Sequence, residues 1–337
     1  MQQEGEDRMK RFKIALPGVV VLIALCGCRL PAPQNRSKVD LSSPEATVIA
    51  SAEAATLLQE FKEAEYFWQQ GAVGRQLVAL EDSSVVPAML EMLKSEDRKT
   101  RCNAGRVLAG LGDDRGLFAV ISELNDIGYR PINKDEARGN ESKLLLFKHK
   151  PAYAHQVRSD RYYAAHMLRE IGDQRAVPAL IETLGDDSIN YQAAIVLGHL
   201  GDKRAIPHLR EMGNDVPWQR LWAGYGLAGL GEPEGFDMLE EVVNSDSQQW
   251  THRRHAVRAL GEFGNRKAVP TLVRALKDEH VNIRVSAARA LGAIGDPAAL
   301  DALVESLNDT EVTKINAPTT VRKEARKAIE AIKADGM

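Results

Sequence analysis

The chain has few cysteines, few aromatic residues and no large excess of charge. Its 337 residues include three cysteines, 5% aromatic residues and a formal net charge of −3 at pH 7. Three cysteines exclude a disulfide framework, so packing must hold the fold together. A nearly neutral chain lacks the basic surface that general nucleic-acid binding requires. We therefore expect an ordinary packed protein that does not have nucleic acid as its partner.

The sequence also lacks the motifs of the common enzyme classes. It contains no Gly-x-Ser-x-Gly nucleophile elbow, no phosphate loop, no His-Glu-x-x-His and no paired-cysteine motif. Its carboxylates are plentiful, but no pair of them stands out as an acid and a base. The sequence therefore predicts that the protein is not an enzyme.

One apolar run, residues 14–25, lies near the N-terminus and is too short to span a bilayer comfortably. It lies between a basic segment and a short cysteine-containing box, namely Lys10, Arg11 and Lys13 before it and Leu25-Cys26-Gly27-Cys28 at its end. This order resembles the signal peptide and lipobox of bacterial lipoproteins. The resemblance implies that residues 1–27 are removed and that Cys28 is diacylated, which gives stable membrane anchoring. A plain secretory signal or an uncleaved anchor is the alternative.

Two features after the box bear on location. Arg29, rather than aspartate, follows the acceptor cysteine, and in lipoproteins of diderm bacteria this favours the outer membrane over the inner one. Residues 28–45 contain several prolines and no apolar period, which predicts a flexible linker. We therefore expect a protein of the bacterial cell envelope, attached to the membrane through its N-terminal lipid.

From about residue 84 onward the chain repeats itself, with three columns of residues identical in six copies. The glycine column, at spacings of 60, 29, 30, 33 and 31 residues, consists of Gly112, Gly172, Gly201, Gly231, Gly264 and Gly295. A leucine stands four residues before each glycine, and an alanine eight residues before it. Self-similarity at a fixed period predicts stacked helical hairpins. Glycine just past a helix supplies a left-handed C-cap conformation that other residues resist.

Each copy contains two expected helices. The first opens with a proline or a small residue, which a first helical turn tolerates, and the second runs from an acidic turn to the glycine. The first glycine spacing is about one repeat too long, which predicts an insertion at about 126–158 within the second repeat. The repeats span 84–333, and their last copy lacks the glycine and ends in a charged C-terminal cap.

Residues 46–83 precede the repeats and lack the leucine–glycine signature. We expect two helices there, at about 46–64 and 66–80, that form an N-terminal cap, because terminal repeats must present one face to water. The predicted fold is therefore all-α, a right-handed α-solenoid of short helical hairpins with terminal caps.

The repeat resembles a known family. Its consensus, A-x-P-x-L…L-x-D…R-x-x-A-A-x-x-L-G-x-I-G-D, is clearest at Ala268 to Asp296. This pattern is similar to the short HEAT repeats named after the phycobilisome lyases, and the resemblance covers 84–333. The family includes scaffolds, chromophore lyase subunits and one class of di-iron hydroxylase. The resemblance therefore implies a fold but no particular function.

Eleven residues before each glycine lies a mostly arginine column: Arg101, Arg161, Asn190, Arg220, Arg253, Arg284 and, by extrapolation, Arg322. An arginine column could bind a row of phosphates. However, the column lies on the packed side of the helix and follows a polar turn residue, usually aspartate. Guanidinium groups suit partly buried carboxylate pairing, so we expect a structural arginine–aspartate ladder.

The second helices are expected to line the concave surface of the solenoid. Positions −13, −9, −6 and −2 from the glycine form a stripe that should face this groove. The predicted partner-binding residues on it are Tyr163, His166, His199, Trp218, Trp222, Tyr225, His255, Arg258 and Arg289. Trp, Tyr and Arg dominate the energetics of protein interfaces. The alternative is that the aromatic rings fill the crevices between neighbouring second helices.

Two other functions are open for the same stripe. His166, Glu170, His199 and His255 could be metal ligands, and Glu170 and His199 occupy equivalent positions in adjacent repeats. A metal site needs three or four convergent ligands, and the His-Glu dipeptides of the iron hydroxylases are absent. We therefore predict no metal and no cofactor. Trp218, Trp222 and Tyr225 could instead stack on a glycan or another small ligand.

These patterns favour a membrane-anchored scaffold that binds a protein or peptide partner in the cell envelope. The partner is expected to occupy the aromatic centre of the groove. A second candidate contact is the apolar segment 144–147 within the insertion.

Overall fold

The computed structural model describes residues 51–127, 152–214, 217–245, 249–313 and 318–335. These ranges all lie within one compact unit, Asp40–Met337. Their only β-structure is an isolated antiparallel bridge between Val312 and Thr320. None of their helices is long and apolar enough to cross a bilayer. The signal segment, Cys28 and the linker 28–45 lie outside the described residues.

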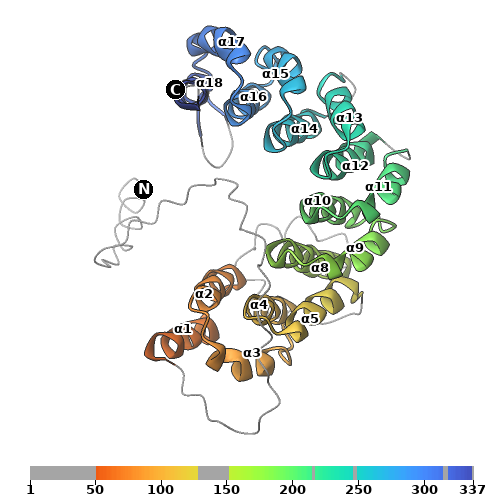
Figure 1. Cartoon of the computed structure of the whole chain (residues 1–337), viewed down its shortest axis with the longest axis vertical. Helices are drawn as coiled ribbons and strands as arrows, with labels where there is room; N and C mark the ends of the chain where they lie inside the picture. Colours follow the sequence, from red (N-terminus) through yellow and green to blue (C-terminus); the bar gives the residue numbers. More distant parts are fainter. Residues whose placement is uncertain (1–50, 128–151, 215–216, 246–248, 314–317, 336–337) are drawn as a thin grey trace, which may run out of the picture. The chain divides into compact units, whose positions relative to one another are not determined.

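Within this unit the helices form two layers, which confirms the predicted all-α solenoid (Figure 1). The first helices of the hairpins are α1 (Ala52–Glu63), α3 (Val86–Met92), α5 (Asp114–Asn125), α9 (Val177–Thr183), α11 (Ile206–Met212), α13 (Pro233–Val243), α15 (Val269–Ala275) and α17 (Leu300–Glu305). The second helices are α2 (Phe67–Ala79), α4 (Arg98–Gly110), α8 (Ala152–Ile171), α10 (Asn190–Leu200), α12 (Pro217–Gly229), α14 (Trp250–Glu262), α16 (Val281–Ile294) and α18 (Val321–Asp335). Each second helix packs against the next one along the chain. Figure 1 shows these second helices on the inner side of the curve.

The residues of the repeated alanine, leucine and glycine columns are core and cap residues, as predicted. All six column alanines and all six column leucines are completely buried. The six column glycines have φ between 68° and 87°, where an L-residue would be strained. At Gly295 the backbone N–H donates to the Leu291 carbonyl, and Asp296 then accepts from the Ala298 N–H to begin the next helical turn. The columns therefore explain how each hairpin ends and how it stacks.

The N-terminal cap is a degenerate repeat, although it lacks the signature. Glu81 has φ of 54°, and among the described residues it is the only non-glycine with a positive φ. Leu77, four residues earlier, is 1% exposed, and Asp82 accepts a hydrogen bond from the Ser84 N–H. Glu81 thus occupies the position of the column glycine. The left-handed backbone conformation is kept although the residue is not glycine. The search for the repeated glycine therefore did not identify this repeat.

A further column lies four residues after each glycine and is completely buried wherever it is alanine. Four repeats place alanine there, at the end of a short 3-10 helix: Ala176, Ala205, Ala268 and Ala299. The other two place Gly116 and Gly235 there, and the chain enters the longer helices α5 and α13 directly. A Cβ on Gly235 would lie 2.3 Å from the Ala228 N, and one on Gly116 would lie 2.2 Å from the Gly105 O. Glycine therefore lets α13 and α5 approach the preceding second helices unusually closely.

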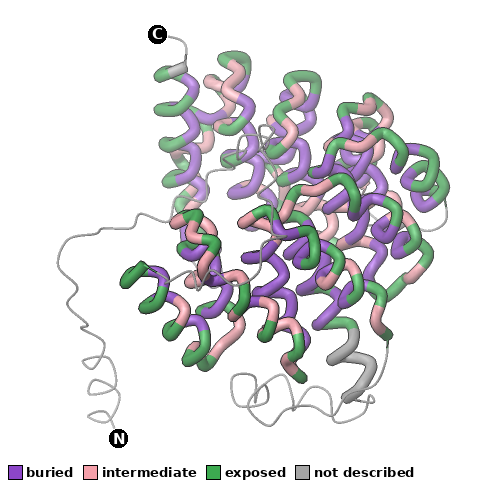
Figure 2. The backbone as a smooth tube through the Cα atoms, turned by 60° about the horizontal axis from the view of Figure 1, so that its bottom comes forward, coloured by how far each residue is buried: buried purple, intermediate pink, exposed green. Residues whose placement is uncertain are grey.

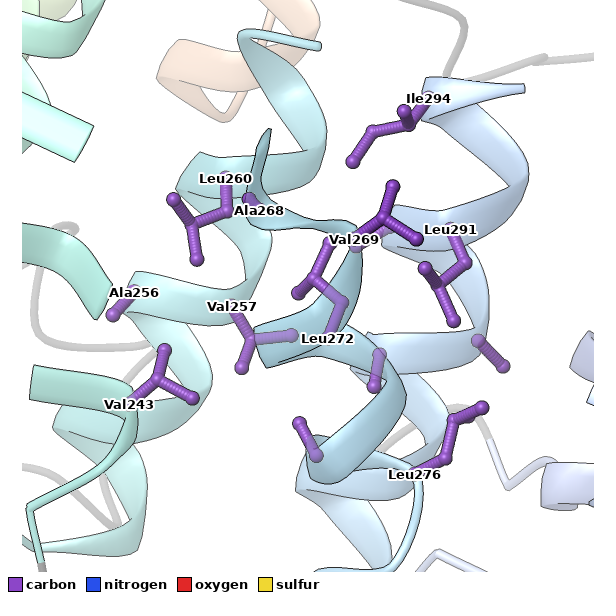
Figure 3. Close-up of a cluster of buried hydrophobic side chains, with 14 of the residues drawn as sticks. Val243, Ala256, Val257, Leu260, Ala268, Val269, Leu272, Leu276, Leu291 and Ile294 are labelled. Atoms are coloured by element: carbon purple, nitrogen blue, oxygen red, sulfur yellow. The ribbon is translucent and has the colours of Figure 1, made fainter. Parts of the chain in front are cut away.

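The hydrophobic core runs between the two layers. Figure 2 shows the buried residues on the sides of the helices that face one another. Figure 3 shows one section, where Leu260, Leu272 and Leu291 meet between α14, α15 and α16. All three leucines are completely buried, so each hairpin is stabilised mainly by its neighbours.

The predicted insertion, 126–158, follows α5 and lies partly outside the described residues. Helix α5 ends at Asn125, and α8 begins at Ala152, so the last residues of the predicted range 126–158 belong to a second helix. Residues 128–151, including the segment 144–147, lie outside the described residues.

Candidate functional site

A row of rings crosses four consecutive second helices; we call it the aromatic ladder. It consists of Tyr162 on α8, Tyr191 on α10, Trp222 on α12 and His255 on α14, with successive ring centroids 6.5, 5.5 and 5.3 Å apart. Tyr162 is 44% exposed, and the other three are half-buried. The ladder therefore presents aromatic surface that is available to a partner.

Sequence reasoning found only half of this ladder. Trp222 and His255 lie at position −9 of their repeats and belong to the predicted stripe. Tyr162 and Tyr191 lie at position −10, which the predicted stripe did not include, although Tyr191 lies beside Trp222 at position −9 of the next second helix. The presence of tyrosine at the same position in two adjacent repeats was the available signal.

Two tyrosines of the predicted groove lie beneath its surface. Tyr163 and Tyr225 are each 8% exposed. Their hydroxyls donate to Asn103 Oδ1 at 2.6 Å and to a carboxylate oxygen of Glu262 at 2.8 Å, respectively. Burial is the main cause that raises the pKa of both phenols. These two rings fill crevices between second helices, as the alternative interpretation expected, and their role is to support the surface.

A polar cluster, which we call the Glu262 cluster, joins α8, α10, α12 and α14. His199 Nε2 lies 3.0 Å from Glu262 Oε1 and 2.6 Å from the Arg169 guanidinium. Helix α12 lies between His199 and Glu262 in the stack, and its equivalent position is Gly229, which has no side chain to separate them. Burial raises the pKa of Glu262, but the hydrogen bonds from His199 and Tyr225 outweigh it, and the net pKa is lowered. Glu262 is therefore ionised and fully engaged at neutral pH.

Glu170 forms a second cluster at the N-terminal side of the surface. Its carboxylate lies 3.4 Å from Arg75, from Arg106 and from His166. His199 belongs instead to the Glu262 cluster, so the structure does not bring the four candidate metal ligands together. Within the part of the chain that the structure describes, no group of three or more His, Cys, Asp and Glu side chains could hold a metal.

The remaining predicted residues lie on the second helices near the ladder. Trp218 is half-buried at the start of α12, and Arg258 is exposed on α14. Arg289 on α16 lies 3.1 Å from Glu324 of α18. Burial raises the pKa of Glu324, but hydrogen bonds from Arg289 and Thr319 outweigh it and lower the pKa to about 2. Arg289 is therefore already committed to an ion pair.

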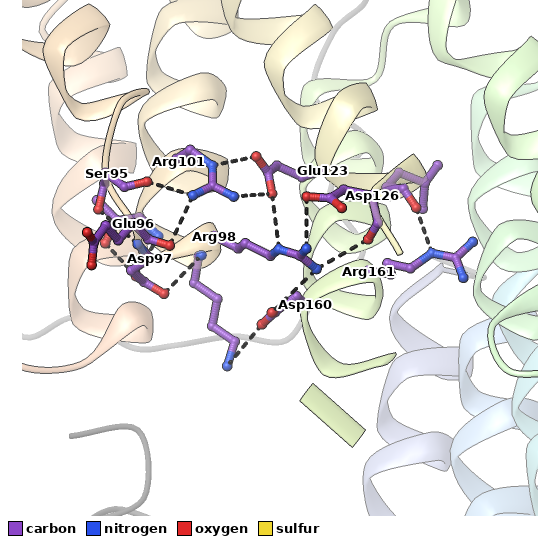
Figure 4. Close-up of polar contacts among 12 residues, drawn as sticks. Ser95, Glu96, Asp97, Arg98, Arg101, Glu123, Asp126, Asp160 and Arg161 are labelled. Carbon is purple, nitrogen blue, oxygen red and sulfur yellow. Dashed lines mark hydrogen bonds and ion pairs between the residues drawn. The ribbon is translucent and has the colours of Figure 1, made fainter. Parts of the chain in front are cut away.

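The arginine column has a structural role, as predicted. Arg161, Arg253 and Arg284 each pair with the turn aspartate of the following repeat, Asp186, Asp278 and Asp309. Arg101 pairs with Glu123, which lies on the following first helix instead of the turn (Figure 4). The column links consecutive hairpins and leaves little capacity for anions.

Figure 4 also shows a buried ion cluster that sequence reasoning missed. Arg98 is 3% exposed and lies 2.8 Å from Asp126 and 3.9 Å from Asp160. Lys99 lies 3.8 Å from the same Asp160 and also lies over the ring of Phe67. Two consecutive cationic residues at the start of a helix would normally indicate a solvated turn, but here the packing of α2, α5 and α8 around Arg98 and Lys99 buries their charges.

One family model and several solved structures are similar to this chain. A family model described as HEAT repeats matches residues 152–228 and 236–330, slightly more than half of the chain. The complex of CpcE and CpcF of phycocyanin lyase from Nostoc sp. PCC7120 is 19% identical, with 73% of this chain and 94% of that chain covered and a TM-score of 0.45. Human deoxyhypusine hydroxylase, solved with glycerol, is 19% identical, with 84% of this chain and 96% of that chain covered and a TM-score of 0.33.

At these identities the two likenesses concern the fold alone. A search of curated protein sequences finds no match. The family model covers six of the second helices from α8 onward, including all those that carry the aromatic ladder. The chain therefore belongs to the HEAT-repeat family.

Proposed function

We propose that the protein is a non-enzymatic scaffold that binds a protein or peptide partner through the exposed surface of its second helices. The observation that carries this proposal is the aromatic ladder, Tyr162–Tyr191–Trp222–His255, which crosses four consecutive repeats. Large aromatic side chains are the residues that anchor protein interfaces. Three of the four rings of the ladder are tyrosine or tryptophan, in a chain where aromatic residues form only 5% of the sequence.

The shape of the array supports the same function. Each of the four second helices α8, α10, α12 and α14 contributes one rung, so a long partner segment could contact several repeats at once. Such extended surfaces are how repeat proteins commonly bind their partners. The polar clusters around Glu170 and Glu262 hold the neighbouring helices in register and leave the ladder as the apolar part of the surface.

The proposed location is the bacterial cell envelope, with the outer membrane favoured. It rests on the lipobox that ends at Cys28, on Arg29 after it, and on the linker 28–45, which would let the folded unit reach a partner near the membrane.

The binding surface can be tested by co-purification from native envelopes after chemical crosslinking. In the double variant Tyr162→Ala, Trp222→Ala, the partner set recovered with the wild type should be reduced about tenfold or more, as expected for the loss of two interface anchors. The matched control is Phe118→Ala, an exposed aromatic on the first helix α5, which should recover the wild-type set. Trp222 also contacts the core, so Tyr162→Ala alone, at an exposed site, serves as the second variant. An unchanged partner set in both variants would refute the surface assignment.

The anchor is tested separately. The variant Cys28→Ala should lose the diacyl mass and should shift from the membrane fraction to the soluble fraction of the envelope, or should retain an uncleaved signal segment. Mass spectrometry of the purified protein measures both outcomes. A wild-type protein without the lipid mass on residue 28 would contradict the lipoprotein assignment.

A further inference from the structure

Most arginines described above pair with a carboxylate, but two arginines of helix α14 do not. Arg254 and Arg258 lie one helical turn apart, and neither contacts a carboxylate among the described residues. Their neighbour Arg253, in the arginine column, pairs with Asp278 in the usual way. Arg254 lies over the ring of Trp250, and its Nε is buried without an acceptor in the described part of the chain.

The nearest potential partner for Arg258 is already occupied. Glu262 lies four residues further along α14, a spacing that commonly forms an ion pair. Its carboxylate instead accepts hydrogen bonds from His199 and Tyr225 and lies 3.5 Å from Arg169. Glu324 lies on α18, two second helices further along, and is likewise engaged by Arg289 of α16. The cationic pair therefore stays uncompensated within the described structure.

The positive charge of the two arginines affects the neighbouring residue His255. Burial, assisted by the positive charges of Arg254 and Arg258, lowers the pKa of His255 to about 4. His255 is therefore neutral at pH 7, which makes it an uncharged, aromatic end to the ladder. The arginine pair and the aromatic ladder thus meet on α14, where His255 lies between the two arginines in the sequence and contacts Trp222.

We propose that Arg254 and Arg258 form a receptor for an acidic peptide segment of the partner, in which a carboxylate side chain neighbours an aromatic or aliphatic one. This inference rests on the proposed function and deepens it by naming the chemistry of the partner. Carboxylates pair with guanidinium groups through charge-assisted hydrogen bonds, and the apolar neighbour packs on Trp222 and His255. Complementarity of charge steers the partner to this point and fixes its register along the repeats.

The test is a selection from a randomised 12-residue peptide display library on the full-length protein in detergent. Three proteins are compared: the wild type, Arg254→Gln/Arg258→Gln, and Arg326→Gln. The last is the matched control, because Arg326 is an exposed arginine of α18 that also has no carboxylate partner among the described residues. Arg258→Gln alone is added because its side chain is exposed and its loss should leave the fold intact.

Peptides selected by the wild type and by Arg326→Gln should be enriched in Asp or Glu beside an aromatic or aliphatic residue. The tightest of them should bind the double glutamine variant at least tenfold more weakly, and Arg258→Gln with an intermediate loss. Selected sets without acidic enrichment, binding to the double variant within twofold of the wild type, or the absence of any selected peptide would each overturn the proposal. Non-acidic peptides that still depend on Tyr162 and Trp222 would refute this inference and leave the proposed function standing.

Discussion

Replacing Arg101 with methionine should lower the free energy of unfolding by roughly 3–5 kcal/mol, the usual cost of leaving a buried charge without its partner. Arg101 and Glu123 are 7% and 8% exposed. The guanidinium makes a two-point contact with the carboxylate, with Nη2 at 2.7 Å from Oε2, and also donates to the carbonyls of Ser95 and Glu96. Methionine fills much of the space but leaves the buried Glu123 carboxylate with only the longer contact to Arg98 Nε, at 3.9 Å.

The matched control is Arg204→Met, which breaks an ion pair of similar geometry with Asp202 on the surface, where the arginine side chain is 62% exposed. Exposed pairs contribute little, so this change should cost less than about 1 kcal/mol. The double variant Arg101→Met, Glu123→Met should recover part of the loss, because an apolar pair replaces the buried ions. Urea denaturation followed by circular dichroism measures all three. A loss below that of the surface control would show that the buried pair does not hold α4 against α5.

Replacing Gly235 with alanine should also destabilise the protein, by about 1–3 kcal/mol or more, the range typical of overpacked sites. Alanine is the better helix former by about 1 kcal/mol, so helix propensity alone predicts the opposite sign. The packing decides the outcome, because the new Cβ would lie 2.3 Å from the backbone N of Ala228 and 2.7 Å from Leu227 C and Cβ. These are backbone and Cβ atoms of α12, which cannot rotate out of the way. Helix α13 would therefore have to move away from α12.

Gly185→Ala is the control for this prediction. A Cβ there would meet only the Glu182 carbonyl oxygen, at 3.6 Å, which is an ordinary contact. Its stability should stay within about 0.5 kcal/mol of the wild type, as is usual for surface substitutions. If Gly235→Ala proved as stable as Gly185→Ala, the close approach of α12 and α13 would not be a constraint on the fold.

The architecture could be predicted because it is repeated. The column alanines, leucines and glycines fix the helix faces and ends in every copy, and six copies make the pattern unmistakable. The sequence could not show backbone geometry that is kept when the residue type changes. Glu81 adopts the glycine conformation without being glycine, and Gly235, like Gly116, marks a continuous first helix where the alanine-bearing repeats have a 3-10 turn.

The candidate site could be predicted only in outline. Helical periodicity placed Trp222, His255 and Arg258 on the inner surface, but it could not show that Tyr163 and Tyr225 are covered by the neighbouring helices. Burial depends on how far each helix is rotated against the next. The same rotation brings Tyr191 beside Trp222. Nor could the sequence show that His199 pairs with Glu262, because the contact passes over a helix whose facing residue is glycine.

The central claim is that the partner binds the inner surface formed by the second helices. Photo-crosslinking in living cells tests it most directly, with a benzophenone amino acid placed at one exposed position at a time. Tyr162, Arg258 and Ala293 probe the second helices, and Phe118 and Val304 probe the first helices. We expect crosslinked adducts of a common mass from the second-helix positions and none of that mass from the first-helix positions. Adducts confined to Phe118 or Val304, or equally strong in both layers, would contradict the account.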